Sequence, residues 1–574
     1  MIIMKFLGSL SSKLAHGLKI AILEPTKLYR FLLKCYRLGF LKTIKKFFIH
    51  SYTDYENDFD LSLKSFTILT TPHCLIIAKQ LKYLLERVGF ECEITHQETE
   101  FQSSVSKCIP IVLAPQIFSK LPKKFIAFQL EQPGSPWFTS EYLSLLKKAT
   151  FVLEFSEKNL DYLQKQGLSF ETLYYCPIFP NGYAPKIRYI VSDNKEYDLV
   201  FYGALNERRK KIIEVISNKY NVLVLSDLFG DELYNQLNRA RLLINIHFYN
   251  NAALETTRLT EAKAFGIDII SESSSSSDID SQFSEFVTFA KSGDIPDLLA
   301  KISFLLNKKE KAEHKIINHQ SRFSPFDFFF LRFLLAQDLI SFEAFSDFFL
   351  ESYPQIKDAL CLSLPETVER KNKFISQKDS INFAIFPGLR HKLGWIGCGY
   401  SYKFIFSLAL IQSKSNITIC EDDVVLPKDY DLVVSKIRNF LDREEGNWQV
   451  FSGLISDISP KARVLSVQSY ENIKFVYLDE AVGLVYSIFS TEAIKTLEQW
   501  TPNKDLDNTI DRFMSKKVAN FITCIPFLVN QDESLVSTLW DERNGDIYKD
   551  YISSTLNKLA KKVYEYESSS TLAR

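Results

Sequence analysis

The feature that most constrains the fold is a regular alternation of strand-like and helix-like segments, which begins at Phe66 and begins again at Asp198. Short apolar and β-branched runs, typical of buried strands, alternate with stretches in which apolar residues recur every three to four positions, typical of helices. Strands that alternate with helices predict parallel sheets with helices on both faces. Two such series in succession predict two Rossmann-like units that face a cleft, with ligands bound beyond the carboxyl ends of the strands.

Composition supports a large folded protein with several units. Of the 574 residues, 46% are hydrophobic and 24% are charged, which excludes a disordered or collagen-like chain. The predicted strands of the two series are 66–70, 110–113, 125–130, 151–155 and 173–175, then 198–202, 222–225, 242–246 and 267–270. The predicted units are a basic N-terminal segment (1–60), two Rossmann-like halves (61–185 and 186–312), a Phe-rich helical bridge (313–355), a third α/β unit (356–560) and a polar tail (561–574).

The cysteines indicate the compartment. Nine cysteines are scattered along the chain, none of them in a CxxC pair, and the eight histidines show no paired spacing. This pattern favours neither a disulfide framework nor a zinc site. It is typical of a protein in a reducing environment, so we expect a cytoplasmic location.

The N-terminal segment is strongly basic. Residues 1–50 hold ten Lys or Arg and one acidic residue, Glu24, although the whole chain has 69 residues of each sign. Within 28–38 the basic and apolar residues interleave at helical spacing, and no apolar run reaches the ~18–20 residues of a membrane span. Two interpretations stay open: a helix bound to the inner face of the inner membrane, or a helix packed on the protein body. Nucleic acid is not an expected partner, because the segment lacks aromatic stacking platforms.

A cluster of carboxylates carries the sharpest chemical signal. The apolar run 416–420 leads directly into Glu421, Asp422 and Asp423. Adjacent carboxylates repel one another more strongly as water is excluded, and a divalent cation removes that repulsion. Mg²⁺ and Mn²⁺ prefer oxygen ligands and accept phosphate and water in the same coordination shell. The triplet is therefore either a metal site for a diphosphate or a solvated turn in which Asp422 or Asp423 caps the next element.

Several motifs around the triplet resemble glycosyltransferase family 25, the lipopolysaccharide-type and collagen-type galactosyl- and glucosyltransferases. In family order they are 362–370 (LSLPETVER), 394–402 (GWIGCGYSY), 421–424 (EDDV), 483–493, 511–514 and 526–537. The resemblance implies a GT-A fold, UDP-galactose or UDP-glucose as the nucleotide-sugar donor, Mn²⁺ or Mg²⁺, and inversion at the anomeric carbon. It assigns donor binding to Arg370, Glu421 and Asp422, and metal binding to Asp422 and Asp423.

Inversion requires a general base that accepts the proton of the acceptor hydroxyl. The candidates are Asp511 first, followed by Asp507, Asp532 and Glu533. The chain departs from the family at one position, because Ser401-Tyr402 stands where the family usually has Ser-His. A tyrosine is a poor base near neutral pH, so the departure predicts impaired or altered chemistry if that histidine is needed.

The second Rossmann-like half begins with a possible diphosphate site. Gly203 follows a predicted strand, and Arg208 or Arg209 lies at the start of the next helix. Free N–H groups at a helix start, with a guanidinium beside them, suit a diphosphate. An exposed basic pair on a helix is the alternative interpretation.

A second motif in this half is 254–271 (LETTRLTEAKAFGIDIIS), which resembles the donor-half helix of GT-B glycosyltransferases of the family-1 and family-4 type. The resemblance implies that Glu261 grips the donor ribose. It also implies an upstream glutamate, for which Glu255 is the candidate, and Arg258 lies on the same helix face as Glu261. An Arg258–Glu261 surface pair is the alternative.

The predicted fold class is α/β: a GT-B-like pair of Rossmann-like domains followed by a GT-A-like α/β domain. The implied function is that of a bacterial bifunctional glycosyltransferase, which transfers sugars from nucleotide-sugar donors to a lipopolysaccharide, lipooligosaccharide or capsule precursor. The acceptor is then lipid-linked or an oligosaccharide. In the alternative, only one unit is active and the other is a scaffold that binds glycan or nucleotide.

Overall fold

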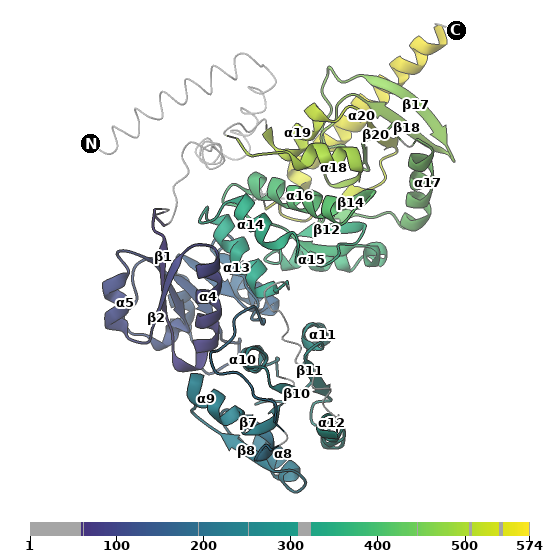
Figure 1. The fold of residues 1–574 in the computed structure, drawn as a ribbon. Helices are drawn as coiled ribbons and strands as arrows, with labels where there is room; N and C mark the ends of the chain where they lie inside the picture. Colours follow the sequence, from purple (N-terminus) through teal and green to yellow (C-terminus); the bar gives the residue numbers. More distant parts are fainter. Residues whose placement is uncertain are drawn as a thin grey trace, which may run out of the picture.

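The computed structural model describes residues 59–572, except 61, 193, 251, 308–322, 445, 504–507 and 539–543. Residues 1–58, which make up nearly all of the basic N-terminal segment with its predicted membrane contact, lie outside the described residues. The described chain contains two purely parallel sheets and one large mixed sheet, each flanked by helices (Figure 1). The predicted fold class is thereby confirmed as two Rossmann-like units followed by a further α/β unit. No described helix is both long enough and apolar enough to cross a bilayer.

The first unit has a six-stranded parallel sheet in the order β2-β1-β3-β4-β5-β6. Its strands are β1 (Ser65–Leu69), β2 (Glu91–Thr95), β3 (Ile109–Leu113), β4 (Ile126–Gln129), β5 (Phe151–Glu154) and β6 (Leu173–Tyr175). Its helices are α4 (Leu75–Arg87), α5 (Glu98–Ser104), α6 (Ser140–Leu146) and α7 (Glu157–Lys165), with short 3₁₀ turns η2 (Pro72–Cys74) and η3 (Pro115–Ile117). The strand order changes direction between β1 and β3, which is where open sheets of this kind bind ligands.

The second unit repeats this plan with a five-stranded parallel sheet in the order β11-β10-β9-β7-β8. Its strands are β7 (Tyr197–Tyr202), β8 (Val222–Leu225), β9 (Ala240–Asn245), β10 (Asp268–Glu272) and β11 (Val287–Ala290). Its helices are α8 (Glu207–Ser217), α9 (Gly230–Leu237), α10 (Thr256–Phe265), α11 (Ser277–Phe283) and α12 (Ile295–Asn307). Helix α10 packs against α4 of the first unit, so the two Rossmann-like units are in contact.

The third unit is built on an eight-stranded sheet in the order β13-β12-β14-β19-β16-β20-β18-β17. Its strands are β12 (Ala359–Ser363), β13 (Ala384–Pro387), β14 (Asn416–Glu421), β16 (Val450–Ser452), β17 (Val464–Tyr470), β18 (Ile473–Leu478), β19 (Tyr486–Ser490) and β20 (Phe521–Ile525), and a separate two-stranded sheet pairs β15 (Val424–Val425) with β21 (Asn530–Gln531). Strand β14 is parallel to β12 and antiparallel to β19. The acidic triplet therefore leaves the sheet from the middle of the unit.

Helices surround this mixed sheet. They are α15 (Val368–Ile375), α16 (Gly394–Ile411), α17 (Tyr430–Arg443), α18 (Thr491–Glu498), α19 (Ile510–Lys517) and α20 (Asn544–Leu572), with the 3₁₀ turn η5 (Lys378–Asn382). Most of the segment predicted as a polar tail is the second half of α20, and Val563 of that half is buried in the core. Helix α20 ends at the C-terminus, away from the Rossmann-like units (Figure 1).

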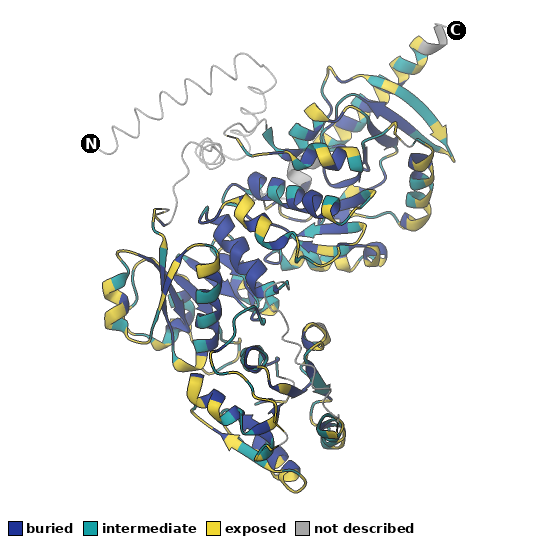
Figure 2. Cartoon of the chain, in the orientation of Figure 1, coloured by how far each residue is buried: buried dark blue, intermediate teal, exposed yellow. Residues whose placement is uncertain are grey.

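The Phe-rich bridge forms α13 (Pro325–Ala336) and α14 (Phe342–Phe349), as the helical period predicts. Every residue of α13 from Phe326 to Ala336 is buried, and this stretch is dark blue in Figure 2. On one side Phe333 meets Tyr174 of β6, with ring centroids 5.0 Å apart. On another side Phe328 meets Phe404 of α16 at 6.3 Å. The bridge is thus a shared core between the first and third units.

A buried ion pair reinforces this junction. Arg332 of α13 donates two hydrogen bonds to Glu366, at 2.8 and 3.0 Å, and neither side chain is exposed at all. Glu366 also accepts a hydrogen bond from the backbone N–H of Tyr175, and Arg390 lies 3.6 Å away. Gln164 of α7 donates to the Glu366 carbonyl at 2.7 Å. The loop after β12 is therefore attached to both the bridge and the first unit.

Candidate active site

The acidic triplet lies at the carboxyl end of β14, where the chain turns toward β15. Strand β12 runs parallel to β14 with Leu362 opposite Glu421, so the end of β12 places Ser363 beside Asp422. Asp422 and Asp423 are only 5% and 4% exposed, so their charges are removed from bulk water. The acidic triplet therefore does not form a solvated surface turn.

Asp422 is held by two partners, one at the end of β12 and one in α15. Arg370 of α15 donates to its Oδ1 from Nε at 2.7 Å and approaches it with Nη2 at 2.6 Å. Ser363 donates to its Oδ2 at 2.7 Å. Burial lowers the pKa of Arg370, but the charges of Asp423 and Asp422 outweigh burial and raise that pKa above its ordinary value. Arg370 is therefore a fixed cation that orients Asp422.

Asp423 has a different environment. Its Oδ2 accepts hydrogen bonds from Gln531 at 3.0 Å and from Asn544 at 2.8 Å, and Arg370 Nη2 lies 3.2 Å from the same oxygen. Its backbone carbonyl accepts from the N–H of Asp532 at 2.7 Å. Its Oδ1 is buried, and no described residue donates to it. Asp423 thus retains one free oxygen inside the site.

Glu421, the first member of the triplet, has a raised pKa. Burial raises the pKa of Glu421 to about 8, and the nearby charge of Asp423 acts in the same direction. The charge of Asp511, the first candidate base, also raises this pKa, although Asp511 lies 90 positions beyond Glu421 in the chain.

Two of the candidate bases, Asp511 and Asp532, already have hydrogen-bond partners. Asp511, in the first turn of α19, accepts hydrogen bonds from the Thr509 hydroxyl and from the N–H of Arg512. Asp532 binds Ser534 and lies 3.8 Å from Lys373, and these partners explain most of its lowered pKa despite partial burial. Asp507 lies outside the described residues.

Tyr402, which replaces the family's usual histidine, belongs to the core. Its ring is fully buried between helix and sheet, 6.2 Å from the ring of Phe489, and its hydroxyl donates to the carbonyl of Leu484 at 3.0 Å. Burial raises the pKa of Tyr402 well above its ordinary value. The side chain is thus a packing element with a satisfied hydroxyl, and it cannot serve as a base near neutral pH.

The predicted metal ligands can be tested against this geometry. Among the described residues, no three His, Cys, Asp or Glu side chains form a group that could hold a metal ion. Both oxygens of Asp422 are engaged, whereas Oδ1 of Asp423 is buried and has no donor. Mg²⁺ is usually bound through one or two carboxylates, with phosphate and water completing its shell. The residues fit a divalent ion that arrives with a diphosphate and is held through Asp423.

In the second unit, the predicted Gly203 and Arg258 lie side by side. Gly203 follows β7 with φ of +127°, and a Cβ built on it would lie 2.6 Å from Arg258 Nη2. Only glycine fits here, because both the backbone conformation and the guanidinium exclude a side chain. The Nε of Arg258 is buried, and no described residue accepts from it. In the turn after β7 the backbone therefore lies close to a guanidinium, an arrangement that suits an anion.

Glu255 is the centre of a buried network in this unit. Its Oε2 is 2.6 Å from His247 Nδ1, and its Oε1 is 3.2 Å from Arg209 Nη2. Burial opposes ionisation, but the bond from His247 and the charge of Arg258 lower the pKa of Glu255 to about 2. The sequence did not single out His247, although it lies two residues past the end of β9, a position where function is expected.

Arg208 and Glu261 are both occupied by neighbours from their own unit. Arg208 makes two bonds to Glu272, at 2.6 and 2.8 Å, and one to the carbonyl of His247. Glu261 accepts from the hydroxyls of Tyr202 at 3.1 Å and Tyr234 at 3.4 Å. Burial raises the pKa of Glu261 against the effect of these bonds. Donor contacts by these two residues stay a prediction.

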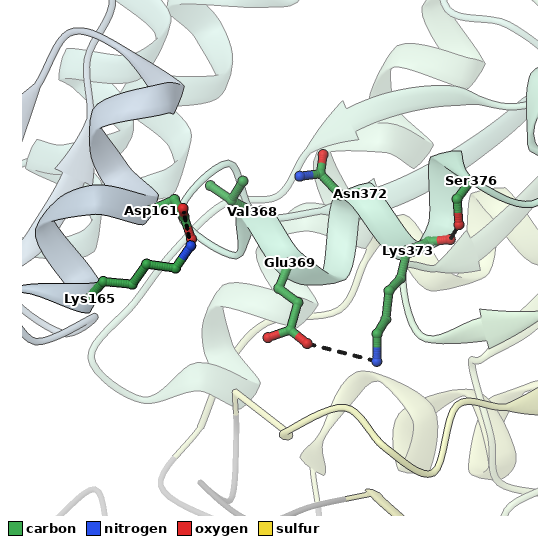
Figure 3. A pocket seen from close by; sticks show the side chains of 7 residues that line it. All are labelled: Asp161, Lys165, Val368, Glu369, Asn372, Lys373 and Ser376. Carbon is green, nitrogen blue, oxygen red and sulfur yellow. Dashed lines mark hydrogen bonds and ion pairs between the residues drawn. The ribbon is translucent and has the colours of Figure 1, made fainter.

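A cavity of about 410 Å³ opens between α7 of the first unit and α15 of the third (Figure 3). Its lining residues are Asp161, Lys165, Val368, Glu369, Asn372, Lys373 and Ser376. The charged residues that line it pair with one another, Lys165 with Asp161 at 2.6 Å and Lys373 with Glu369 at 3.8 Å. Arg370 does not line the cavity, because its guanidinium points to Asp422. The cavity therefore lies outside the acidic site.

Comparison with known proteins leaves the family open. No protein-family model matches the sequence, and no curated protein matches it closely enough to be called a relative. The solved structures similar to it include the lipopolysaccharide outer core galactosyltransferase WaaB in its apo form (12% identity, TM-score 0.26, covering 44% of this chain and 93% of that one). Others are sucrose-phosphate synthase from Thermosynechococcus elongatus (11%, 0.29, 43% and 90%) and T4 phage β-glucosyltransferase (13%, 0.30, 50% and 98%). Similarities of this size assign no function.

Proposed function

We propose that the chain is a nucleotide-sugar-dependent glycosyltransferase whose active site lies at the carboxyl end of β14. The observation that carries this proposal is the buried acidic turn, in which Arg370 and Ser363 orient Asp422 while Asp423 keeps one oxygen without a donor. The motif resemblance to family 25 assigns donor binding to Arg370 and Asp422, and metal binding to Asp422 and Asp423, so it points to this same turn. A diphosphate-linked sugar is the substrate class that suits this site, because its phosphates bind both a hard cation and an arginine guanidinium.

The proposed reaction transfers a hexose from UDP-galactose or UDP-glucose to an acceptor hydroxyl. Asp423 would hold Mn²⁺ or Mg²⁺, and the bound ion would supply Lewis-acid stabilisation of the diphosphate charge. Arg370 holds Asp422 in place, and its charge offsets part of the burial that raises the pKa of Asp422. Asp511, whose charge acts on Glu421, is the proposed base for the acceptor hydroxyl, since Glu421 with a pKa of about 8 is largely protonated near neutral pH.

The second proposed site is the Rossmann-like pair, with Gly203, Arg258 and Glu261 at the donor and a lipid-linked or oligosaccharide acceptor opposite. Under this proposal the chain is bifunctional and adds sugars in sequence to a bacterial surface glycan, from the cytoplasmic face of the membrane. Tethered sites raise the local concentration of one product at the next site. The rigid junction at Arg332 and Glu366 supports a fixed spacing between the two sites.

One observation favours the alternative in which only the third unit is active. Both oxygens of Glu261 accept hydrogen bonds from tyrosines of the same unit, and Arg208 is paired with Glu272. Side chains satisfied in this way have less reason to bind a donor. In that case the Rossmann-like pair is a scaffold that binds glycan or nucleotide.

The test is release of UDP by the full chain from UDP-galactose and UDP-glucose, with and without Mn²⁺ and with candidate oligosaccharide acceptors. Asp423→Ala should lower Mn²⁺-dependent turnover by at least ~10²-fold, the usual cost of losing an electrostatic contact in an active site. Asp431→Ala is the matched control, because Asp431 is an exposed acid of the same unit that pairs with Asn382. Full turnover in the Asp423 variant would refute the proposed site. Loss of a separate activity in Glu261→Ala would show that the second unit is active.

A further inference from the structure

The first residue of the C-terminal helix lies in the acidic site. Asn544, which is 1% exposed, begins α20 and donates from Nδ2 to Asp423 Oδ2 at 2.8 Å and to the carbonyl of Asp532 at 3.2 Å. Its backbone N–H donates to the carbonyl of Leu535 at 2.8 Å. No motif pointed to this residue, which lies 121 positions beyond Asp423 in the chain.

Asn544 and Asp423 share an unusual property. Oδ1 of Asn544 and Oδ1 of Asp423 are both buried, and no described residue donates to either oxygen. The amide cannot be reversed to correct this, because its carbonyl would then face the Asp423 carboxylate and the Asp532 carbonyl. Buried polar atoms are nearly always paired, so unpaired acceptors on two hydrogen-bonded neighbours call for a partner.

That partner must be positive or a donor, since both atoms are acceptors. Carboxylate and amide carbonyl oxygens are the ligands that hard divalent cations take in proteins. The amino end of α20 adds partial positive charge at the same place, which favours a diphosphate bound to such an ion over the ion alone. Asp422 is unsuited to the same task, because Arg370 and Ser363 engage both of its oxygens.

We propose that Asn544 and Asp423 together bind one divalent cation, Mn²⁺ or Mg²⁺, through their two Oδ1 atoms. The ion site is then made by the end of β14 and the start of α20, rather than by Asp422 and Asp423. This inference rests on the proposed function, and it makes the C-terminal helix part of the active site.

The experiment is a titration of the purified full chain with Mn²⁺, in which free Mn²⁺ is measured by electron paramagnetic resonance with and without UDP. The variants are Asp423→Ala, Asn544→Ala and Asn544→Asp. We expect one bound Mn²⁺ per chain, tighter with UDP, and at least a tenfold loss of affinity in Asp423→Ala and Asn544→Ala. Asn544→Asp keeps an oxygen ligand but loses the amide donor, so it should bind within about threefold of wild type. Asn382→Ala is the control, because Asn382 bonds an aspartate on the surface of the same unit.

The outcomes separate the two claims. If Asp423→Ala loses Mn²⁺ and Asn544→Ala does not, the role of Asn544 is refuted and the proposed active site stands. If neither variant loses Mn²⁺, the metal site of the proposed function is refuted as well. If Asn544→Asp loses Mn²⁺ as fully as Asn544→Ala, Asn544 acts only as a donor to Asp423, and the inference fails.

The same variants also test whether a loss of Mn²⁺ binding is due to misfolding. Without metal, the carboxylate introduced by Asn544→Asp repels Asp423, so the melting temperature of this variant should fall below that of wild type and rise more than wild type when Mn²⁺ is added. If Asn544→Asp melts at the same temperature with and without Mn²⁺, the inference is overturned, even if Asn544→Ala does not fold.

Discussion

Replacing Arg332 with methionine should destabilise the junction between the first and third units. The change leaves Glu366 fully buried with its two hydrogen bonds from Arg332, at 2.8 and 3.0 Å, removed. Removing one partner of a buried pair costs about 3–5 kcal/mol. Arg390 at 3.6 Å and the Tyr175 N–H remain, so we expect the lower end of that range.

The pKa of Glu366 gives an independent magnitude. Burial raises the pKa of Glu366, but Arg332 and Arg390 lower it from 4.5 to about 2. At ~1.4 kcal/mol for each pH unit, this difference corresponds to roughly 3 kcal/mol of stability above pH 4.5. Because the folded-state pKa is depressed, this contribution is lost as the pH falls from about 4.5 to about 2.

Urea unfolding of the full chain at pH 7, followed by tryptophan fluorescence, measures the effect. Arg332→Met should unfold at clearly lower urea than wild type, and Arg332→Met with Glu366→Gln should recover part of the loss, since no buried charge is left. Lys210→Met is the control, because Lys210 and Glu207 form an exposed pair worth little. If Arg332→Met unfolds at the same urea concentration as Lys210→Met, the reasoning is wrong.

Three further predictions concern single residues. Gly203→Ala should weaken UDP binding by the Rossmann-like pair in calorimetry, because its Cβ would lie 2.6 Å from Arg258 Nη2; unchanged binding would contradict an anion site there. Tyr402→Phe should lower stability by about 1 kcal/mol in urea and leave turnover per folded molecule unchanged, whereas lost turnover would give the hydroxyl a catalytic role. Burial raises the pKa of Asp327 from 3.8 to about 7, so the wild type loses stability as the pH rises through that window. Asp327→Asn should remove this loss of stability. If the melting temperatures of the two proteins change equally between those pH values, the prediction is wrong.

Much of the sheet arrangement could be predicted from the sequence. Every strand predicted for the two Rossmann-like units is present, because buried parallel strands are continuous apolar runs that differ clearly from helices. Strands β2 and β11, which lie at the edges of their sheets, were not predicted. An edge strand is only partly buried, so β2 (Glu91–Thr95) mixes charged and apolar residues. Such a short mixed segment cannot be recognised as a strand from its local pattern.

The candidate site was predictable only where its residues are close in the chain. The acidic triplet is contiguous, and Arg370 lies in a recognisable motif, so both could be found. Ser363 and Gln531 lie inside recognised motifs, but their contacts with the site depend on strand register. Asn544 lies in no motif and reaches the site through helix packing, which no local spacing records. Tyr402 shows the opposite case, because the motif suggested a chemical position and the structure gives it a packing role.

The bridge helix determines how this chain can be dissected. Since α13 is buried between the first and third units, a fragment that starts at residue 356 would lack Arg332 and the ring of Phe328 that covers Phe404. Glu366 would then be without its main counter-charge. Because Glu366 lies only four residues before Arg370, the loss of Arg332 would also disturb the segment that orients Asp422. Donor specificity of each site is therefore best read from the intact polypeptide, with one site inactivated at a time.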